Sequence, residues 1–419
     1  MDDIILQFHT SAIGVLWPAM LRLPAWVTYV GAYTVGGALV LGWIALMAII
    51  WTYGERRIAG FIQVRLGPNR VGPLGVFQPI ADGIKLLCKE DTMPTVANRV
   101  LFFVAPILVM LGAMIPFAVL PFSERLVLSN MDLALYYILA FQAIEVIGIL
   151  MAGWGPGSKW SLYGGMRLAA QMLSYEIPLG LCALVIILLA GSLNLGEIVR
   201  WQEGADGVRE PAFGLARPWI LGWAVFRSPA ALAAFVVFYV GGLAATKRAP
   251  FDLPEAESEL VAGYHTEYSG IRFAFFFMAE YAAMYVICGL AAILFLGGWH
   301  GPIPRPTLSA GTSFMGSWSG AVHAGAPAAS SFVGKCALLA TSLWAVATSG
   351  EGLRIIAHEV VGAANMIGKS FGLYFVMIWA RWTLPRIRID QVMHLCLKVL
   401  LPIGLACVVW AAIQVVLFP

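Results

Sequence analysis

The stretch IRFAFFFMAEYAAMYVICGLAAILFLGG, residues 271–298, decides the fold class of this protein. It exceeds the about 20 residues that a helix needs to cross the hydrocarbon core of a bilayer, and Glu280 is its only acidic residue. A charged side chain at that depth costs at least ~2.5 kcal/mol on insertion scales, so such residues usually have a function. The stretch therefore predicts a membrane-spanning helix that carries a functional acid.

Composition extends this prediction to the whole chain. The 419 residues are 60% hydrophobic and 12% charged, with a mean hydropathy of +0.83, whereas soluble domains are about 45–50% apolar and about 25% charged. The net charge of +3 is small, and no run of Lys and Arg suggests nucleic-acid binding. We therefore expect an all-α polytopic membrane protein with about eight transmembrane helices, amphipathic surface helices and charged cytoplasmic loops. The expected spans are about 30–53, 99–121, 131–152, 166–190, 229–247, 271–298, 369–385 and 396–417.

The pattern predicts a single membrane domain, residues 1–419, with four regions. Residues 1–29 mix apolar residues with Pro and Arg and predict an amphipathic segment at the membrane surface. Residues 30–298 hold spans one to six, and residues 369–419 hold the last two. Residues 299–368 between them predict an inserted loop region, in which 299–334 is a Gly/Pro/Ser/Ala-rich linker with little charge and Lys335–Gly350 is an interfacial or re-entrant piece.

Basic residues concentrate in the odd-numbered loops between these spans. Seven of them, Arg56 to Arg99, lie in or at the edge of the first loop, whereas the second loop has Arg125 alone. By the positive-inside rule the odd loops are cytoplasmic and both termini face the periplasm.

The cysteines and histidines do not suggest a metal or a redox cofactor. None of the six cysteines forms a C-x-x-C pair, and most lie in apolar spans, which is typical of inert buried thiols. No two histidines stand at metal-ligand spacing. If this protein takes part in redox chemistry, we expect the electrons to travel on another subunit.

Two charged segments interrupt the apolar chain. The first, GERRIAGFIQVRLGPNRVGPLGVFQPIADGIKLLCKED, residues 54–91, contains Gly-Pro turns and then a helical pattern from Phe77 to Lys89. An ordinary solvated loop is one interpretation, and a protein interface or the mouth of a site for an amphipathic ligand is the other. The second segment is KRAPFDLPEAESELVAGYHTEYSG, residues 247–270.

The second segment crowds four carboxylates into eight residues, namely Asp252, Glu255, Glu257 and Glu259. Like charges this close raise one another's pKa values, so these acids are candidates for shared protons. The alternative is that acidic residues at a helix start only favour the helix macrodipole.

Three carboxylates lie within predicted spans, at Glu145, Glu176 and Glu280. At 1.5 Å per residue each is about 12–15 Å from the cytoplasmic end of its helix. The common depth favours one polar layer that handles protons, and the alternative is three unrelated, locally satisfied acids.

Five motifs in this order resemble the H subunit of respiratory complex I. They are the GFIQVRLGPNRVGPLGVFQPIADGIKLLCKE segment, AAQMLSYE at 169–176, APFDLPEAESELVAGYHTEYSG at 249–270, FFFMAEY at 275–281 and RWTLPRIRIDQVMHLCLKVLLP at 381–402. The resemblance covers residues 30–298 and 369–418 and is weakest at 1–28 and 299–368.

The resemblance implies a membrane subunit of a proton-pumping NADH:quinone oxidoreductase in a prokaryotic inner membrane. Such a subunit forms much of the ubiquinone or menaquinone chamber and couples quinone reduction to proton translocation. FMN, nicotinamide and iron–sulfur sites would lie on other subunits of the peripheral and membrane arms, so the isolated chain should have no activity. By position, the quinone chamber would include Glu55, Arg56, Arg65, Asp82 and Lys85. The proton-coupling residues would be Glu145, Glu176, Arg248, Asp252, Glu255, Glu257, Glu259 and Glu280.

The chain departs from the family pattern at three informative positions. Ala245 stands where the family has a glutamate, Lys247 where it has an asparagine, and Glu145 where a small or apolar residue is expected. Glu145 is a candidate to restore the missing carboxylate from another helix, and pairing with a local donor such as Gln142 or a tyrosine is the alternative.

Two other functions are weighed against this one, a role in an energy-converting hydrogenase-type complex and an independent secondary transporter. The absence of clear internal repeats argues against the transporter. The first loop, in its full charged and Gly/Pro-rich form, argues against the hydrogenase-type complex.

Overall fold

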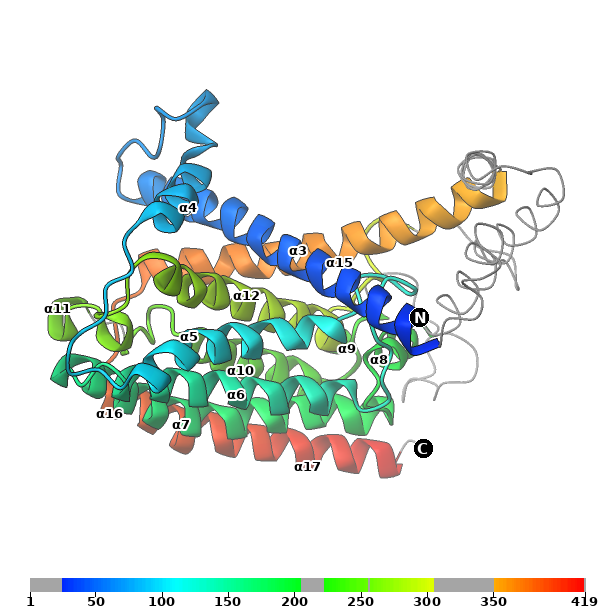
Figure 1. The fold of residues 1–419 in the computed structure, drawn as a ribbon. Helices are drawn as coiled ribbons and strands as arrows, with labels where there is room; N and C mark the ends of the chain where they lie inside the picture. Colours follow the sequence, from blue (N-terminus) through cyan, green and yellow to red (C-terminus); the bar gives the residue numbers. More distant parts are fainter. Residues whose placement is uncertain (1–24, 205–221, 255–256, 305–349, 418–419) are drawn as a thin grey trace, which may run out of the picture.

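The computed structural model describes residues 25–204, 222–254, 257–304 and 350–417 (Figure 1). Those residues are helices and connecting loops, with no strand among them, so the prediction of an all-α polytopic membrane protein is confirmed. Seven of the described helices are long and apolar enough to cross a membrane. The fifth of the eight expected spans, 229–247, corresponds to α10, which has only 17 residues. The long helices and α10 are α3 (Ala25–Ile62), α5 (Arg99–Met114), α6 (Ala134–Trp154), α7 (Lys159–Ala190), α10 (Pro229–Ala245), α12 (Gly270–Phe295), α15 (Gly350–Thr383) and the pair α16 (Ile389–His394) and α17 (Leu401–Leu417).

The last span is one continuous apolar helix with a π-helical turn, Leu395–Leu400, between α16 and α17. Pro402 follows this turn and has no backbone N–H to donate. The missing donor explains why the regular i to i−4 pattern is interrupted there.

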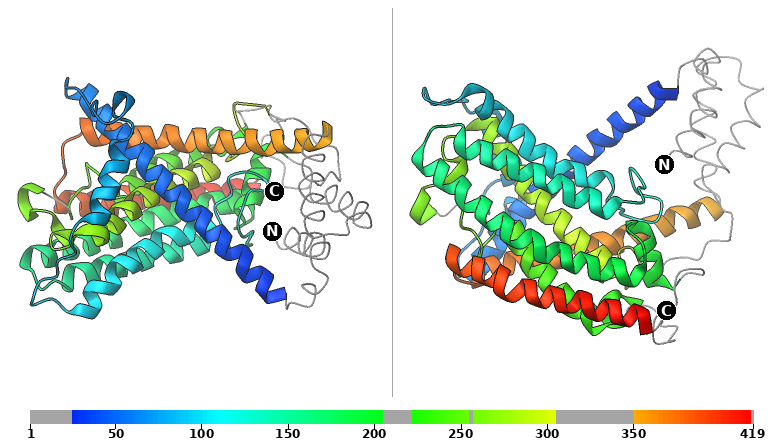
Figure 2. Two further views of the ribbon diagram at one scale, coloured as in Figure 1. Left: turned by 45° about the horizontal axis from the view of Figure 1, so that its top comes forward. Right: turned by 90° about the horizontal axis from the view of Figure 1, so that it is seen from below.

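Helix α12 is the centre of the bundle. Of its most apolar window 83% is buried, compared with 22% for the last span, because α12 packs against α3, α5, α10 and α15. Helix α3 crosses the bundle diagonally, and its N-terminal part diverges from the other helices (Figure 2). The central position of α12 means that Glu280 is surrounded by protein and not by lipid.

Short helices cap the two ends of the bundle. Figure 1 places α4 (Gln78–Cys88) and α11 (Glu257–Leu260) at one end, and α8 (Leu195–Glu203) and α9 (Ala224–Arg227) at the other. Helix α4 confirms the helix expected from Phe77 to Lys89. The two charged segments, residues 54–91 in the first loop and 247–270 in the fifth loop, therefore share one end of the bundle. Of the expected amphipathic N-terminal segment, residues 1–29, residues 1–24 lie outside the described part of the chain, and residues 25–29 already belong to α3.

The seventh span differs from its prediction. Hydropathy predicts a short span at 369–385, but α15 begins at Gly350 and has 34 residues. The expected start is wrong because charged residues in the first half of the helix lower its hydropathy. Glu359, for example, is accommodated by accepting a hydrogen bond from the backbone N–H of Arg125 at 3.2 Å. The inserted region therefore does not extend as a loop to residue 368.

Candidate functional site

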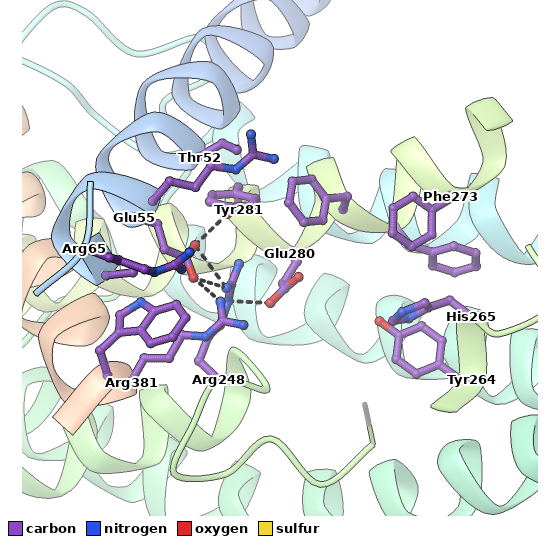
Figure 3. A pocket seen from close by; sticks show the side chains of 15 residues that line it. Thr52, Glu55, Arg65, Arg248, Tyr264, His265, Phe273, Glu280, Tyr281 and Arg381 are labelled. Carbon is purple, nitrogen blue, oxygen red and sulfur yellow. Dashed lines mark hydrogen bonds and ion pairs between the residues drawn. The ribbon is translucent and has the colours of Figure 1, made fainter. Parts of the chain in front are cut away.

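A buried ionic cluster lies where α3, α12, α15 and the segment after α10 meet (Figure 3). We call it the Arg248 cluster, and it consists of Glu55, Arg248, Glu280, Tyr281 and Arg381. Glu55, Arg248 and Glu280 are only 6%, 4% and 8% exposed. Charges are almost never this deeply buried unless they are paired.

Arg248 joins two of the helices. Its Nη1 donates to both carboxylate oxygens of Glu55, at 3.0 and 3.2 Å, and its Nε pairs with Glu280. Burial lowers the pKa of Arg248, but Glu280 and Glu55 raise it, and the net pKa lies above its usual value. The guanidinium also lies over the Tyr281 ring, 4.9 Å from the ring centroid. Arg248 is therefore held in its charged form between α3 and α12.

Glu55 has further partners. Tyr281 donates its hydroxyl to Glu55 Oε2 at 2.7 Å, and Arg381 from the end of α15 pairs with Glu55 Oε1. With both oxygens engaged, the Glu55 side chain ties α3, α12 and α15 together.

The backbone after α10 is fixed by α7. The side chain of Gln171, which is fully buried, donates to the carbonyl oxygens of Ala244, at 2.8 Å, and Phe251, at 3.1 Å. Lys247 has a φ of 55°, in the left-handed region that a residue with a Cβ seldom adopts. This turn directs Lys247 and Arg248 to different neighbours.

A cavity of about 320 Å³ opens beside the Arg248 cluster. Its volume is within the range of small-molecule sites, about 300–1,000 Å³. One end is charged, and an aromatic group lies apart from it (Figure 3). The charged lining is Glu55, Arg56, Arg65, Arg248, Glu280 and Arg381, and the aromatic lining includes Tyr264, His265, Phe273, Phe276 and Phe277. The cavity suits a ligand with a polar head and an apolar, planar body.

The first-loop candidates divide into two groups. Glu55, Arg56 and Arg65 line the cavity. Asp82 supports it from α4 by pairing with Arg56 at 2.6 Å, whereas Lys85 is exposed on α4 and is not among the lining residues.

The fifth-loop acids do not form the expected like-charge group in the described residues. Glu259 pairs with Arg167 at 2.5 Å and with Arg386 at 3.2 Å. The hydrogen bond from Arg167 is the main cause that lowers the pKa of Glu259, so the expected upward shift is wrong for this residue. Asp252 is half-buried. Glu255 and the side chain of Glu257 lie outside the described part of the structure.

The ion pairs of Glu259 give a testable pH dependence. A carboxyl with a lowered pKa stabilises the fold above its unfolded-state pKa, and this stabilisation is lost as pH falls through the folded-state pKa. We expect Glu259→Gln to lower the thermal midpoint of the assembled protein at neutral pH, and the difference from wild type to disappear in acid. Thermal denaturation over a pH series measures it, with Glu267→Gln as the same change elsewhere in the loop. A difference that grows in acid would contradict the assignment.

The remaining membrane carboxylates lie apart from the Arg248 cluster. Glu145 on α6 pairs with Lys247 at 2.6 Å, and the two side chains are 7% and 3% exposed. Glu176 is exposed on the outer face of α7 in this single chain. Tyr175 on α7 is buried, and its hydroxyl donates to the sulfur of Met172. Glu145 therefore has a cation as its partner, and not the Gln142 or tyrosine that the alternative hypothesis expects.

Three basic residues of the site are absent from the candidates that the sequence supplies, namely Arg381, Lys247 and His265. In the sequence Arg381 marks only the orientation of a loop, Lys247 is only a departure from a pattern, and His265 is one histidine in a charged loop. A signal for the first two exists, because the sequence places carboxylates inside the spans and buried carboxylates require cations.

These features define a class of protein, a multi-pass helical membrane protein with an ionic cavity at one end of its bundle. Residues 35–412 match the family model described as NADH dehydrogenase. The chain is 42% identical over 380 residues to the H subunit of the NADH-quinone oxidoreductase of Chlorobaculum tepidum, covering 90% of this chain and 91% of that one. It is also 42% identical over 381 residues to NADH-quinone oxidoreductase subunit 8 of Rhodothermus marinus, covering 91% and 96%.

The chain therefore belongs to the family of the NADH-quinone oxidoreductase H subunit, and the resemblance drawn from its motifs is confirmed. It is a bacterial multi-pass membrane protein. The hydrogenase-type and transporter alternatives are not favoured.

Proposed function

We propose that this chain forms much of the quinone chamber of a proton-pumping NADH:quinone oxidoreductase and couples quinone reduction to proton translocation. The observation that supports this most is the cavity, with charged residues at one end and aromatic residues away from it. A quinone head has carbonyl oxygens that accept hydrogen bonds, and its ring and tail pack against aromatic side chains. Arginine side chains donate to such oxygens in a fixed geometry.

The coupling part of the proposal rests on the Arg248 cluster at the charged end. Reduction of a quinone to a quinol takes up two electrons and two protons at the headgroup. Glu55 and Glu280 are the carboxylates nearest to that end, so a change of charge in the cavity acts on their pairing with Arg248. Glu145 and Glu176 continue the acidic groups across α6 and α7.

The rest of the machinery belongs to other subunits in this proposal. FMN and iron–sulfur clusters would deliver electrons from partner subunits of the peripheral arm, and the isolated chain would have no activity. The first loop, α4 and α11 would face those partners on the cytoplasmic side, and both termini would face the periplasm.

Arg65 provides a test of the chamber. It lines the cavity from an exposed loop, and its Nε donates to Gln63 at 2.6 Å. A hydrogen bond from a charged donor contributes about 1.5–3 kcal/mol, so Arg65→Ala should raise the quinone KM about tenfold or more. Electron transfer from NADH to a hydrophilic artificial acceptor should stay normal in the assembled complex.

Arg70→Ala is the matched control, because Arg70 is an exposed arginine of the same loop that is not among the cavity-lining residues. Equal losses in both variants, or parallel loss of the artificial-acceptor activity, would show that the loop acts on assembly and not on quinone.

A further inference from the structure

Every Asp, Glu, Lys and Arg that is buried in the described residues lies in one region of the bundle. The five are Glu55, Glu145, Lys247, Arg248 and Glu280. They form two groups joined by the backbone, because Lys247 and Arg248 are consecutive. Lys247 forms an ion pair with Glu145, and Arg248 forms ion pairs with Glu55 and Glu280.

The charges of this region balance when Arg381 is included. Three carboxylates, Glu55, Glu145 and Glu280, face three cations, Lys247, Arg248 and Arg381, and the Arg381 side chain is 27% exposed. A proton added to any of the carboxylates leaves one net positive charge in a poorly solvated site. Such an excess charge is expensive, so the region favours the release of a proton elsewhere.

Only one of the three cations can release that proton. An arginine guanidinium stays protonated in proteins, whereas a buried lysine ammonium can become a neutral amine. Lys247 is thus the single basic side chain in the balanced group that can switch its charge.

Lys247 is also placed between the cavity and the far side of α7. Its ammonium is 6.0 Å from the ring centroid of Tyr264, which lines the cavity. On the other side, its partner Glu145 lies on α6, which packs against α7, and α7 carries Tyr175 and, on its exposed face, Glu176.

We propose that Lys247 is the proton-releasing residue of this charge-balanced region. When Glu55 or Glu280 takes up a proton, Lys247 passes a proton to Glu145. The inference deepens the proposed function and rests on it. A chamber proton adds to a carboxylate oxygen of Glu55 or Glu280, and the region gains one charge. An N–H bond of Lys247 then breaks, an O–H bond forms on Glu145, and that proton leaves toward Tyr175 and Glu176. Lys247 remains as a neutral amine beside the Glu145 carboxylate, and the region is neutral again.

The starting charges are restored when the proton on Glu55 or Glu280 moves to the neutral Lys247 amine: an O–H bond breaks and an N–H bond forms. No electron moves in these steps, and one proton has crossed from the chamber side to the α7 side.

The decisive variant is Lys247→Arg in the assembled complex. Arginine keeps the charge and the ability to pair with Glu145, but it cannot release a proton. We expect slower NADH:quinone reduction. We also expect that fewer protons, or none, are translocated per electron. A purely structural role would be satisfied by arginine, so wild-type proton translocation in this variant would overturn the proposal.

Two further variants make the result unambiguous. Lys369→Arg makes the same replacement at another partly buried lysine, where the ammonium binds carbonyl oxygens at the C-terminus of α12. An equal loss of proton translocation in Lys369→Arg would overturn the proposal, because the larger side chain would then be the cause. If Lys247→Arg does not assemble, the double variant Glu145→Gln with Lys247→Gln decides, because it is neutral and has no releasable proton. Proton translocation at the wild-type ratio in that double variant would overturn the proposal.

The same preparations separate this inference from the proposed function. If the wild-type complex reduces no quinone, the proposed function fails. If it reduces quinone and pumps, and Lys247→Arg pumps equally well, only the role of Lys247 fails.

Discussion

Replacement of Arg248 by methionine is expected to destabilise the assembled protein by about 3–5 kcal/mol, because it leaves buried carboxylates without their shared cation. Glu280 loses the guanidinium Nε that pairs with it, and Glu55 retains its pairing with Arg381 and Tyr281. Quinone reduction should fall with the loss of the charged end of the cavity.

The measurement compares complex abundance, thermal midpoint and quinone reduction in the same membranes. Arg200→Met is the control, because Arg200 is at the opposite end of the bundle and half-exposed, with Glu124 at 3.5 Å. Surface pairs of this kind contribute about 0–1 kcal/mol. If Arg248→Met assembled and turned over as well as Arg200→Met, the cluster would be neither a stabilising nor a functional element.

The helices of this fold are predictable from the sequence because lipid imposes a simple rule. A helix that satisfies its own backbone polar groups and carries about 20 apolar residues can cross the bilayer, so hydropathy alone finds α5, α6, α7 and α12. The same rule misplaces the start of α15, because Glu359 and His358 are polar residues that neighbouring segments accommodate. Hydropathy counts the cost of a charge but does not include the partner that offsets it.

The residues of the site are more predictable than their partnerships. Glu55, Arg248 and Glu280 are all candidates from the sequence, but there they belong to three different groups, the chamber, the fifth loop and the membrane interior. The structure joins them through one guanidinium. Sequence spacing relates residues along one helix, whereas these contacts link α3, α12 and the segment after α10, which depend on tertiary packing.

The fifth loop also shows that contacts between distant segments decide how a residue behaves, here in the direction of a pKa shift. Crowded acids predict raised pKa values when only their neighbours in sequence are considered. Arg167 on α7 and Arg386 after α15 are distant in sequence, and they lower the pKa of Glu259 instead. Which neighbours a carboxylate has in space decides the direction of its shift.

The largest coupling is expected between Glu145 and Lys247. Each is a departure from the family pattern, and in the structure each is the ion-pair partner of the other at 2.6 Å. A buried lysine without a carboxylate, or a buried carboxylate without a cation, costs about 3–5 kcal/mol. We therefore expect Glu145→Gln and Lys247→Gln to lower assembly and thermal midpoint strongly as single variants.

The double variant Glu145→Gln with Lys247→Gln should be more stable than either single variant, because it leaves no unpaired charge and its two amides can hydrogen-bond. A double-mutant cycle on the thermal midpoint measures the coupling, with Lys247→Gln plus Arg200→Met as a pair of distant changes whose effects should add.

Ala245→Glu in the Glu145→Gln background tests the hypothesis that Glu145 only relocates a carboxylate. That combination supplies an acid for Lys247 from α10. If it restores the thermal midpoint and the double variant does not, relocation is favoured. If the double variant restores the thermal midpoint instead, the two departures from the family pattern are a matched ion pair, since a buried cation at position 247 requires a carboxylate on α6.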